Sequence, residues 1–186
     1  MDRRLFLRFP PLAAVATLLG GAGIAMDERT RKGFKVDASK DRWDEELHIM
    51  GGSFRRMVSA KDTDGDLCIY HTTRQEKGGP ALHLHFHQDE WFYPMSGAFI
   101  MRVGDDRFDL KGGDSAFAPC GVPHAFAKVS EGEAQMLVLF QPAGSMEEFF
   151  AEVGKFGPSI PKDLETLWKD LWAAHGMQLV GPPLQF

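Results

Sequence analysis

Short runs of alternating apolar and polar residues follow one another through the middle of the chain. Such a period of two is the pattern of a strand with one face in a core. Turn signals such as Asp64-Gly65 and Gly112-Gly113 separate the runs. The predicted strands span residues 54–60, 67–73, 81–86, 90–95, 98–103, 107–110, 115–119, 124–129 and 134–141. Short strands at this spacing predict an all-β domain, either a sandwich or a barrel.

The period changes after the last strand, and two helices are predicted. Residues 145–154 start with the N-cap residue Ser145, and Glu148 is placed to complete a capping box. A second helix is predicted from Pro161 to its stop at Gly176. Its apolar stripe consists of Leu164, Leu167, Trp168, Leu171 and Trp172. We interpret this stripe as a packing surface.

The first 25 residues carry charges, then an apolar stretch, then small residues, which is the order of a secretory signal. The stretch Arg3-Arg4-Leu5-Phe6-Leu7-Arg8 resembles a twin-arginine export signal, and Ala25 is a plausible cleavage position. A membrane anchor is the alternative, which Pro10 and Pro11 disfavour. We therefore expect a periplasmic or secreted protein that meets a membrane only transiently, through this segment.

These patterns predict four segments along the chain. They are a signal peptide (1–25), a linker and N-terminal arm (26–48), a barrel (49–142), and C-terminal helices with a tail (143–186). An apolar content of 44% supports a real core. The net charge of −5 and the lack of a basic stripe argue against nucleic-acid binding. Cys68 and Cys120 show no disulfide framework, so we expect two unpaired thiols.

Three histidines alternate in "ALHLHFHQDEWFY", residues 81–93, and would share one face of a strand. Residues i and i+2 lie roughly 6.6 Å apart, so either His83 with His85 or His85 with His87 can bind one metal ion, whereas i and i+4 are too distant. Glu90 could add an oxygen ligand after a short turn. His124 is the best candidate for a further ligand. The alternative is a solvated strand face lined with imidazoles.

Two ordered stretches resemble the motifs of the cupin superfamily. They are "GGPALHLHFHQDEWFYPMSG" and "GDSAFAPCGVPHAFAK", with fifteen residues between their matching parts. The resemblance covers roughly residues 50–142 and implies an antiparallel jelly-roll β-barrel. It also implies one metal ion held by His83, His85, Glu90 and His124. His87 then lies at the barrel mouth or surface and is not a ligand.

The second stretch departs from the family pattern at its end, where Lys128 stands in place of the usual Asn. Lys128 shares its strand parity with His124, so its side chain could point inward near the site. A surface lysine at the strand end is the alternative that we favour.

Three histidines and a glutamate suit one divalent first-row metal, namely iron, manganese, nickel, cobalt, copper or zinc. The stretches "HLHFHQDEWFY", "GSMEEFF" and "HGMQLVGPP" resemble small single-domain cupins similar to quercetin 2,3-dioxygenase. This resemblance implies an oxygenase that acts on a small aromatic or enolic compound, with Glu90 as the general base. The alternatives are a cupin isomerase or lyase acting on a sugar or keto acid, and a binding protein without turnover.

An apolar substrate pocket is expected around the metal. Its expected lining consists of Phe92, Phe99, Met101, Phe117, Phe126 and Met136, each of which could instead be plain core. The cupin resemblance also implies a homodimer, for which the Trp-rich C-terminal helix offers apolar surface.

Overall fold

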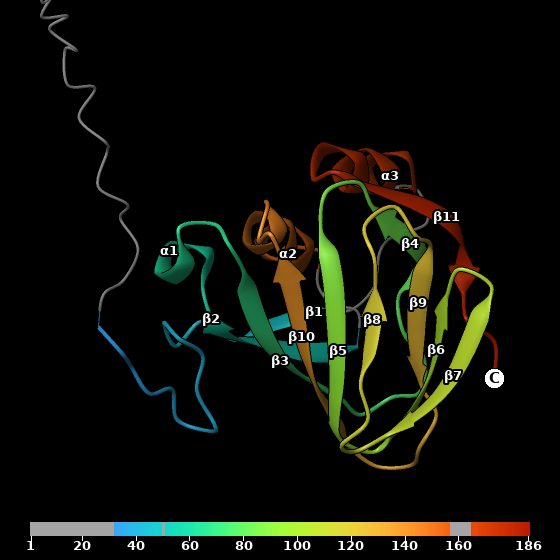
Figure 1. Cartoon of the computed structure of the whole chain (residues 1–186), viewed down its shortest axis with the longest axis horizontal. Helices are drawn as coiled ribbons and strands as arrows, with labels where there is room; N and C mark the ends of the chain where they lie inside the picture. Colours follow the sequence, from blue (N-terminus) through green and yellow to red (C-terminus); the bar gives the residue numbers. More distant parts are fainter. Residues whose placement is uncertain (1–31, 50, 157–164) are drawn as a thin grey trace, which may run out of the picture.

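Two antiparallel sheets face one another in the computed structural model, which describes residues 32–49, 51–156 and 165–186 (Figure 1). One sheet has the order β1-β2-β3-β10-β5-β8, with β1 Leu47–Ile49, β2 Gly52–Val58, β3 Cys68–Arg74, β5 Asp89–Ser96, β8 Ala116–Ala118 and β10 Ala134–Gln141. The other has the order β11-β4-β9-β6-β7, with β4 Ala81–His85, β6 Ala98–Val103, β7 Asp106–Lys111, β9 His124–Lys128 and β11 Met177–Pro183. This is a jelly-roll arrangement, and hydrogen bonds do not close the two sheets into a ring within these residues.

The core lies between the two sheets and follows from the alternation in the sequence. Tyr70, Phe92 and Met136 point inward from the first sheet, and Phe99 and Met101 from the second, each at most 1% exposed. Burying side chains of this size stabilises the fold by roughly 1.5–3 kcal/mol each. The all-β prediction is confirmed, and every one of the predicted strands is present within a few residues of its expected bounds.

A single helical turn, α1 (Ala60–Thr63), stands where the sequence predicted the end of a strand and a hairpin turn. Ser59 caps it, and the Asp62 side chain accepts a hydrogen bond from the Ser59 backbone N–H. Asp64 ends it in the left-handed conformation, which Asp tolerates better than most residues. A capping box therefore lies at Ser59, where none was predicted.

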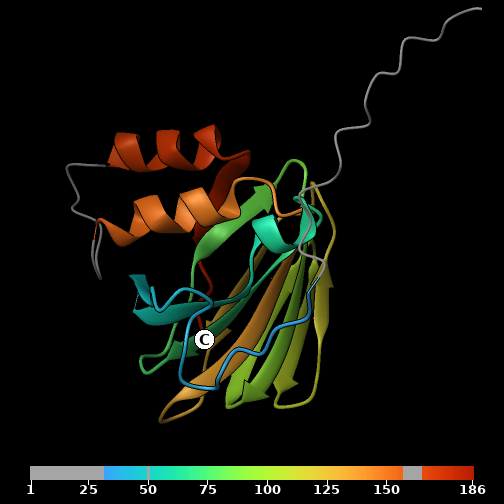
Figure 2. The same cartoon turned by 90° about the vertical axis from the view of Figure 1, so that its left-hand side faces the viewer.

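Two helices, α2 (Met146–Gly154) and α3 (Glu165–Ala174), lie side by side at one end of the sheets (Figure 2). The predicted capping box at Ser145 is wrong, because its side chain makes no capping hydrogen bond. Ser145 Oγ instead lies 3.0 Å from His175 Nδ1, which joins the start of α2 to the end of α3. Gly176 follows α3 with a positive φ of 72°, which explains why the helix stops there.

The apolar stripe of α3 packs inward, as predicted, with Trp168, Leu171 and Trp172 buried, although Leu167 is exposed. The two tryptophans are therefore covered within one chain, and the homodimer stays a prediction. Leu164 and the expected helix start at Pro161 lie outside the described residues.

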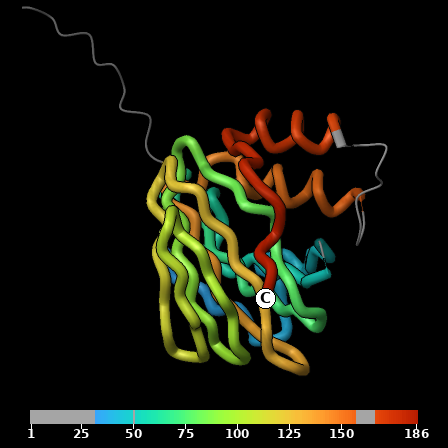
Figure 3. Tube along the Cα trace, turned by 90° about the vertical axis from the view of Figure 1, so that its right-hand side faces the viewer, coloured from blue at the N-terminus to red at the C-terminus, as the bar shows by residue number. Residues whose placement is uncertain are grey.

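The C-terminal tail forms a strand that the sequence analysis missed. β11 pairs with β4 antiparallel, with Met177 opposite His85 and Leu179 opposite His83 (Figure 3). Its Gly and Pro residues argue against a strand in the sequence. At the edge of a sheet these residues are tolerated, because one side of the strand needs no hydrogen-bonding partner.

Both cysteines are unpaired, as expected, with Cys68 buried and Cys120 exposed. The proposed signal peptide and its cleavage position lie outside the described residues. None of the helices described is long and apolar enough to cross a membrane.

Candidate metal centre

Four buried side chains, those of His83, His85, Glu90 and His124, offer ligand atoms that all lie within 4.8 Å of one another. The histidines come from the second sheet, His83 and His85 from β4, and His124 from its neighbour β9, directly opposite His83. Glu90 comes from β5 in the first sheet. The chain crosses between the sheets after His85, so Glu90 reaches the histidines across the interior.

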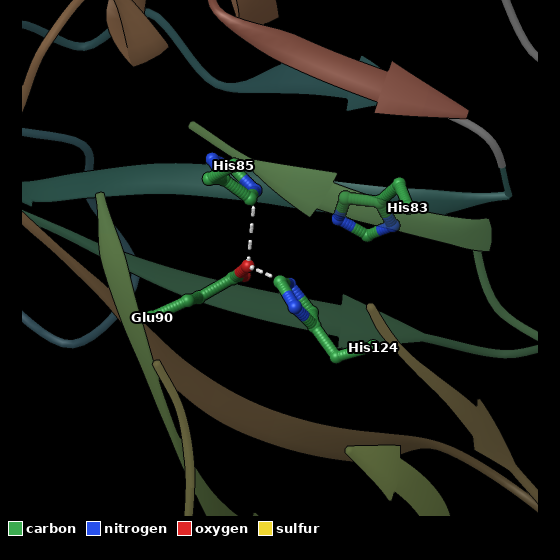
Figure 4. A group of neighbouring side chains, drawn as sticks. All are labelled: His83, His85, Glu90 and His124. Atoms are coloured by element: carbon green, nitrogen blue, oxygen red, sulfur yellow. Dashed lines mark hydrogen bonds and ion pairs between the residues drawn. The ribbon is translucent and has the colours of Figure 1, made fainter. Parts of the chain in front are cut away.

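Glu90 is the centre of the polar contacts in this group (Figure 4). Its Oε2 lies 2.8 Å from His124 Nε2 and 3.3 Å from His85 Nε2. His83 lies beside the others, with its ring centroid 4.6 Å from that of His124 and 5.3 Å from that of His85.

Backbone carbonyls fix the orientation of two of these rings. His83 Nδ1 lies 2.8 Å from the Ala81 carbonyl oxygen, and His124 Nδ1 lies 2.9 Å from that of Val122. A carbonyl oxygen only accepts, so both Nδ1 atoms donate. The Nε2 atoms then face the interior, which is the orientation found in metal-binding histidines.

Burial and hydrogen bonds shift the pKa values of His83, His124 and Glu90 in different directions. Burial lowers the pKa of His83 to about 3, so its Nε2 lone pair is available at neutral pH. Burial would also lower the pKa of His124, but the hydrogen bond to Glu90 outweighs it and raises that pKa. Burial would raise the pKa of Glu90, yet the hydrogen bonds from His124 and His85 hold it below the ordinary value, so the carboxylate is ionised.

The donor set fits a divalent transition metal. Imidazole nitrogens and one carboxylate oxygen suit first-row ions. An ion about 2.0–2.3 Å from each donor needs donors no more than about 4.5 Å apart, which small side-chain rotations would provide. His85 Nδ1 is buried without a hydrogen-bond partner, so this ring is oriented by its Nε2 contact with Glu90 and by packing. Four protein ligands leave coordination positions for a small molecule.

His87 lies outside the group and is exposed, as predicted. β4 ends at His85, and a bend at Phe86 and His87 turns the chain toward β5. His87 approaches the loop at Gly176 instead, where a Cβ would lie 3.8 Å from its ring.

A small cavity of about 50 Å³ opens beside the histidines and Glu90. Helices α2 and α3 cover it, and the ring of Trp172 lies edge-on to His83 with 4.8 Å between centroids. Apart from His83, His85 and Glu90, its lining consists of Phe54, Arg74, Pro80, Phe126, Val138, Phe140, Met146, Phe149, Phe150, Trp172 and Met177. The walls are therefore mainly apolar.

The expected pocket lining is largely different from the observed one. Of the six residues named from the sequence, only Phe126 lines this cavity. Phe92, Phe99, Met101 and Met136 are buried in the core. Phe117 is 53% exposed, because its position on β8 points to the outer face of the sheet. The expectation that it points inward is wrong.

Much of the lining that sequence reasoning missed comes from the C-terminal elements and from β2, β3 and β10. The apolar faces of the two helices supply Met146, Phe149 and Trp172, and the C-terminal strand supplies Met177. β3 supplies Arg74, which is in phase with buried Tyr70, and β10 supplies Val138 and Phe140, which are in phase with Met136. Strand parity was the signal that could have found them.

Lys128 is 1% exposed, so the favoured expectation of a surface lysine is wrong. Its Nζ donates to the backbone carbonyls of Gln75 and Ser130, at 2.7 and 2.8 Å. Lys128 therefore links the segments at Gln75 and Ser130 through hydrogen bonds, and it does not line the cavity.

Part of the chain is similar to a known protein family and to a curated protein. Residues 70–140 match the family described as Cupin domain. An uncharacterized protein of Methanocaldococcus jannaschii is 27% identical over 67 residues, which are 36% of this chain and 54% of that protein. The chain thus spans about half the length of this curated relative.

Solved structures are similar to part of this chain at low sequence identity. A structure described as a sugar phosphate isomerase from a cupin superfamily, from Silicibacter pomeroyi, has a TM-score of 0.51 at 19% identity, over 60% of this chain and 77% of that one. An RmlC-like cupin from Shewanella frigidimarina has a TM-score of 0.48 at 22% identity, over 60% and 92%. The two opposed sheets agree with the similarity of residues 70–140 to the cupin domain family.

Proposed function

We propose that the protein is a metal-dependent oxygenase that acts on a small enolic or aromatic compound. The observation that carries this proposal is the buried group of three histidines and Glu90, open on one side to an apolar, helix-covered cavity. A divalent ion held there would act as a Lewis acid toward a substrate oxygen and as the site of dioxygen chemistry.

The residues of the chain supply the remaining functions. Glu90 is ionised and can accept the proton of an enol or phenol, although its lowered pKa makes it a weak base in this arrangement. Trp172 and Phe149 pack edge to face with 5.0 Å between centroids and cover the cavity, which keeps water from the reacting groups.

The lining favours an oxygenase over the alternative of a sugar isomerase or lyase. A sugar carries several hydroxyl groups, each of which needs a hydrogen-bonding partner when it is buried. Outside the His–Glu group, Arg74 is the one charged side chain among the described residues of the lining. A flat, weakly polar substrate fits such walls better.

The test starts from native protein, with measurement of bound metal, followed by reconstitution with iron, manganese, nickel, cobalt, copper or zinc. An oxygen electrode then records consumption with quercetin and with the smaller enol acetylacetone. We expect dioxygen uptake that requires both metal and substrate and that His124→Ala abolishes, whereas His87→Ala retains it. Anaerobic turnover would indicate an isomerase or lyase, and binding without any product would indicate a binding protein.

We propose further that the chain is exported and works as a homodimer. The twin-arginine resemblance at Arg3-Arg4 supports export, and replacing both residues by Lys should leave precursor inside the cell. The cupin resemblance supports the dimer. Light scattering that gives the mass of one chain would refute it.

A further inference from the structure

Trp172 carries a buried donor that the protein leaves without an acceptor. Its side chain is 3% exposed, and its indole Nε1–H makes no hydrogen bond within the part of the chain that the structure describes. A buried tryptophan N–H normally has a hydrogen-bond partner, and a buried donor without one destabilises the fold. Such an exception needs a physical reason, and binding of a ligand is one.

Aromatic rings surround the indole of Trp172. The rings of His83, Phe149 and Trp168 lie edge to face with it, at 4.8, 5.0 and 5.7 Å between centroids. Contacts between an N–H and the face of a ring are weak, so these neighbours do not replace an oxygen acceptor. His83 Nδ1 donates to the Ala81 carbonyl, and His83 Nε2 makes no hydrogen bond with the indole.

The indole belongs to the wall of the cavity beside the candidate metal centre. Trp172 and His83 both line this cavity. Glu90 is the one lining side chain with an oxygen atom among the described residues, and its Oε2 contacts His85 and His124. The lining therefore holds no side-chain oxygen for the indole N–H. Its acceptor has to come from a molecule inside the cavity.

A ligand of a few atoms can reach both the metal and the indole. An ion binds about 2 Å from an imidazole nitrogen, on the interior side of the His83 ring. The indole of Trp172 lies edge-on to that same ring. A cavity of about 50 Å³ holds roughly three to five water-sized groups, because one such group needs about 10–15 Å³. These dimensions favour a small molecule with two oxygen atoms a few bonds apart.

We infer that Trp172 is the specificity-determining residue of this cavity, and that it selects substrates with a second oxygen acceptor. One substrate oxygen faces the three histidines and Glu90. The other accepts a hydrogen bond from the Trp172 indole Nε1–H. This inference rests on the proposed function, because it concerns the same cavity, and it narrows the substrate to a small compound with two oxygen atoms close together.

The experiment observes the indole N–H directly. Protein labelled with ¹⁵N is loaded with zinc, which has no redox chemistry, and zinc per chain is determined first. The four tryptophans each have one indole N–H, which a proton–nitrogen correlation spectrum detects. Trp172→Phe identifies the Trp172 signal by its loss. If that variant does not fold, single Phe replacements of the other three tryptophans identify the signal by elimination.

Two zinc-binding probes differ in the acceptor that they offer. Acetylacetone has two oxygen atoms, whereas imidazole binds zinc through one nitrogen and presents an N–H in place of an acceptor. We expect acetylacetone to move the Trp172 indole proton downfield, because a hydrogen bond deshields it, and by more than the indole protons of the other tryptophans. Imidazole should give no downfield shift.

Affinities show what the hydrogen bond contributes. In calorimetry on zinc-loaded protein, Trp172→Phe should weaken acetylacetone binding by about three- to tenfold, the usual effect of one hydrogen bond, and should change imidazole binding by less than about twofold. Trp168→Phe is the matched control, because Trp168 lies one turn away on α3 and does not line the cavity. It should keep both affinities. Zinc content should be unchanged in both variants.

The possible outcomes separate this inference from the proposed function. A Trp172 signal that acetylacetone does not move downfield, or an acetylacetone affinity that Trp172→Phe does not change, overturns the role of Trp172. Binding of imidazole without binding of acetylacetone overturns it as well. A downfield shift without the dioxygen uptake described above supports the hydrogen bond and refutes the oxygenase. A protein that binds no zinc overturns the metal centre, and with it both proposals.

Discussion

Glu90 Oε2 and His124 Nε2 lie 2.8 Å apart, although the two residues belong to different sheets. His124 Nδ1 faces the Val122 carbonyl at the same time, so both ring nitrogens of this histidine meet acceptors. In the absence of metal, His124 is therefore an imidazolium, which agrees with its raised pKa. The proton on Nε2 occupies the lone pair through which this histidine would bind a metal ion.

Metal binding should consequently release a proton from His124. At pH 6.5 a histidine with the ordinary pKa of about 6.5 is half protonated, whereas the raised pKa of His124 leaves it protonated in more than half of the molecules. We expect release of up to about one proton per bound zinc ion at pH 6.5, falling toward zero as the pH rises through the pKa of His124. Calorimetric zinc titrations in buffers of different ionisation enthalpy measure this number. A release that is zero at pH 6.5 would contradict the imidazolium.

The metal should depend on His124 and not on His87. His124→Ala removes one of the converging donors and should weaken metal binding more than about tenfold. His87→Ala changes an exposed side chain outside the group and should bind metal as the wild type does. Metal per chain after dialysis against a weak chelator distinguishes the two variants. Equal retention in both would show that the assigned ligand set is wrong.

Acid should destabilise the metal-free protein through His83. The folded-state pKa of about 3 lies below the unfolded value of about 6.5, so between these values the unfolded chain binds a proton that the folded chain does not. Stability contributed by neutral His83 is therefore lost as the pH falls below about 6.5, with a slope approaching 1.4 kcal/mol per pH unit, about the full linkage of one proton.

Urea unfolding of chelator-treated protein between pH 5 and 6 isolates this effect. Glu90 is ionised in both states in that range, because its folded pKa is lowered and its unfolded pKa is near 4.5. His83→Gln cannot titrate and should show a slope smaller by up to about 1.4 kcal/mol per pH unit. The same slope in both proteins would mean that His83 titrates normally in the folded state.

Glu147 should hold α2 in its position over the cavity. Its carboxylate accepts hydrogen bonds from the Ala60 backbone N–H at 2.8 Å and from Ser59 Oγ at 3.1 Å, and it pairs with Arg56 at 3.4 Å. Glu147→Ala should lower the free energy of unfolding by about 2 kcal/mol, as loss of hydrogen bonds to a charged group does. Hydrogen exchange in α2 should increase as well.

Glu148, the next residue on the same helix, provides a matched control, because it is exposed. Glu148→Ala should change the free energy of unfolding by less than about 0.5 kcal/mol. If the two variants are equally stable, α2 is held by its apolar contacts alone.

Local sequence determined the all-β class and the strands of this protein. Alternation of apolar and polar residues sets which face of a strand is buried, and glycine-containing turns separate the strands, so both can be read from a single chain. The candidate metal group was also accessible, since the i, i+2 spacing of His83 and His85 places them together on one face. The resemblance to cupin motifs then selected Glu90 and His124 over His87.

Tertiary structure decided the rest, because it depends on which strands face one another. Glu90 was expected beside the histidines on the bend after their strand, but it reaches them from the opposite sheet. Phe117 and Phe126 look alike as strand aromatics, yet only Phe126 lines the cavity, because β8 presents Phe117 outward. The pairing of β11 with β4 and the packing of α2 and α3 over the histidines are contacts between distant segments, which no local pattern encodes. These contacts put Met177 and Trp172 at the site, and they determine the size of the ligand that the cavity can accept.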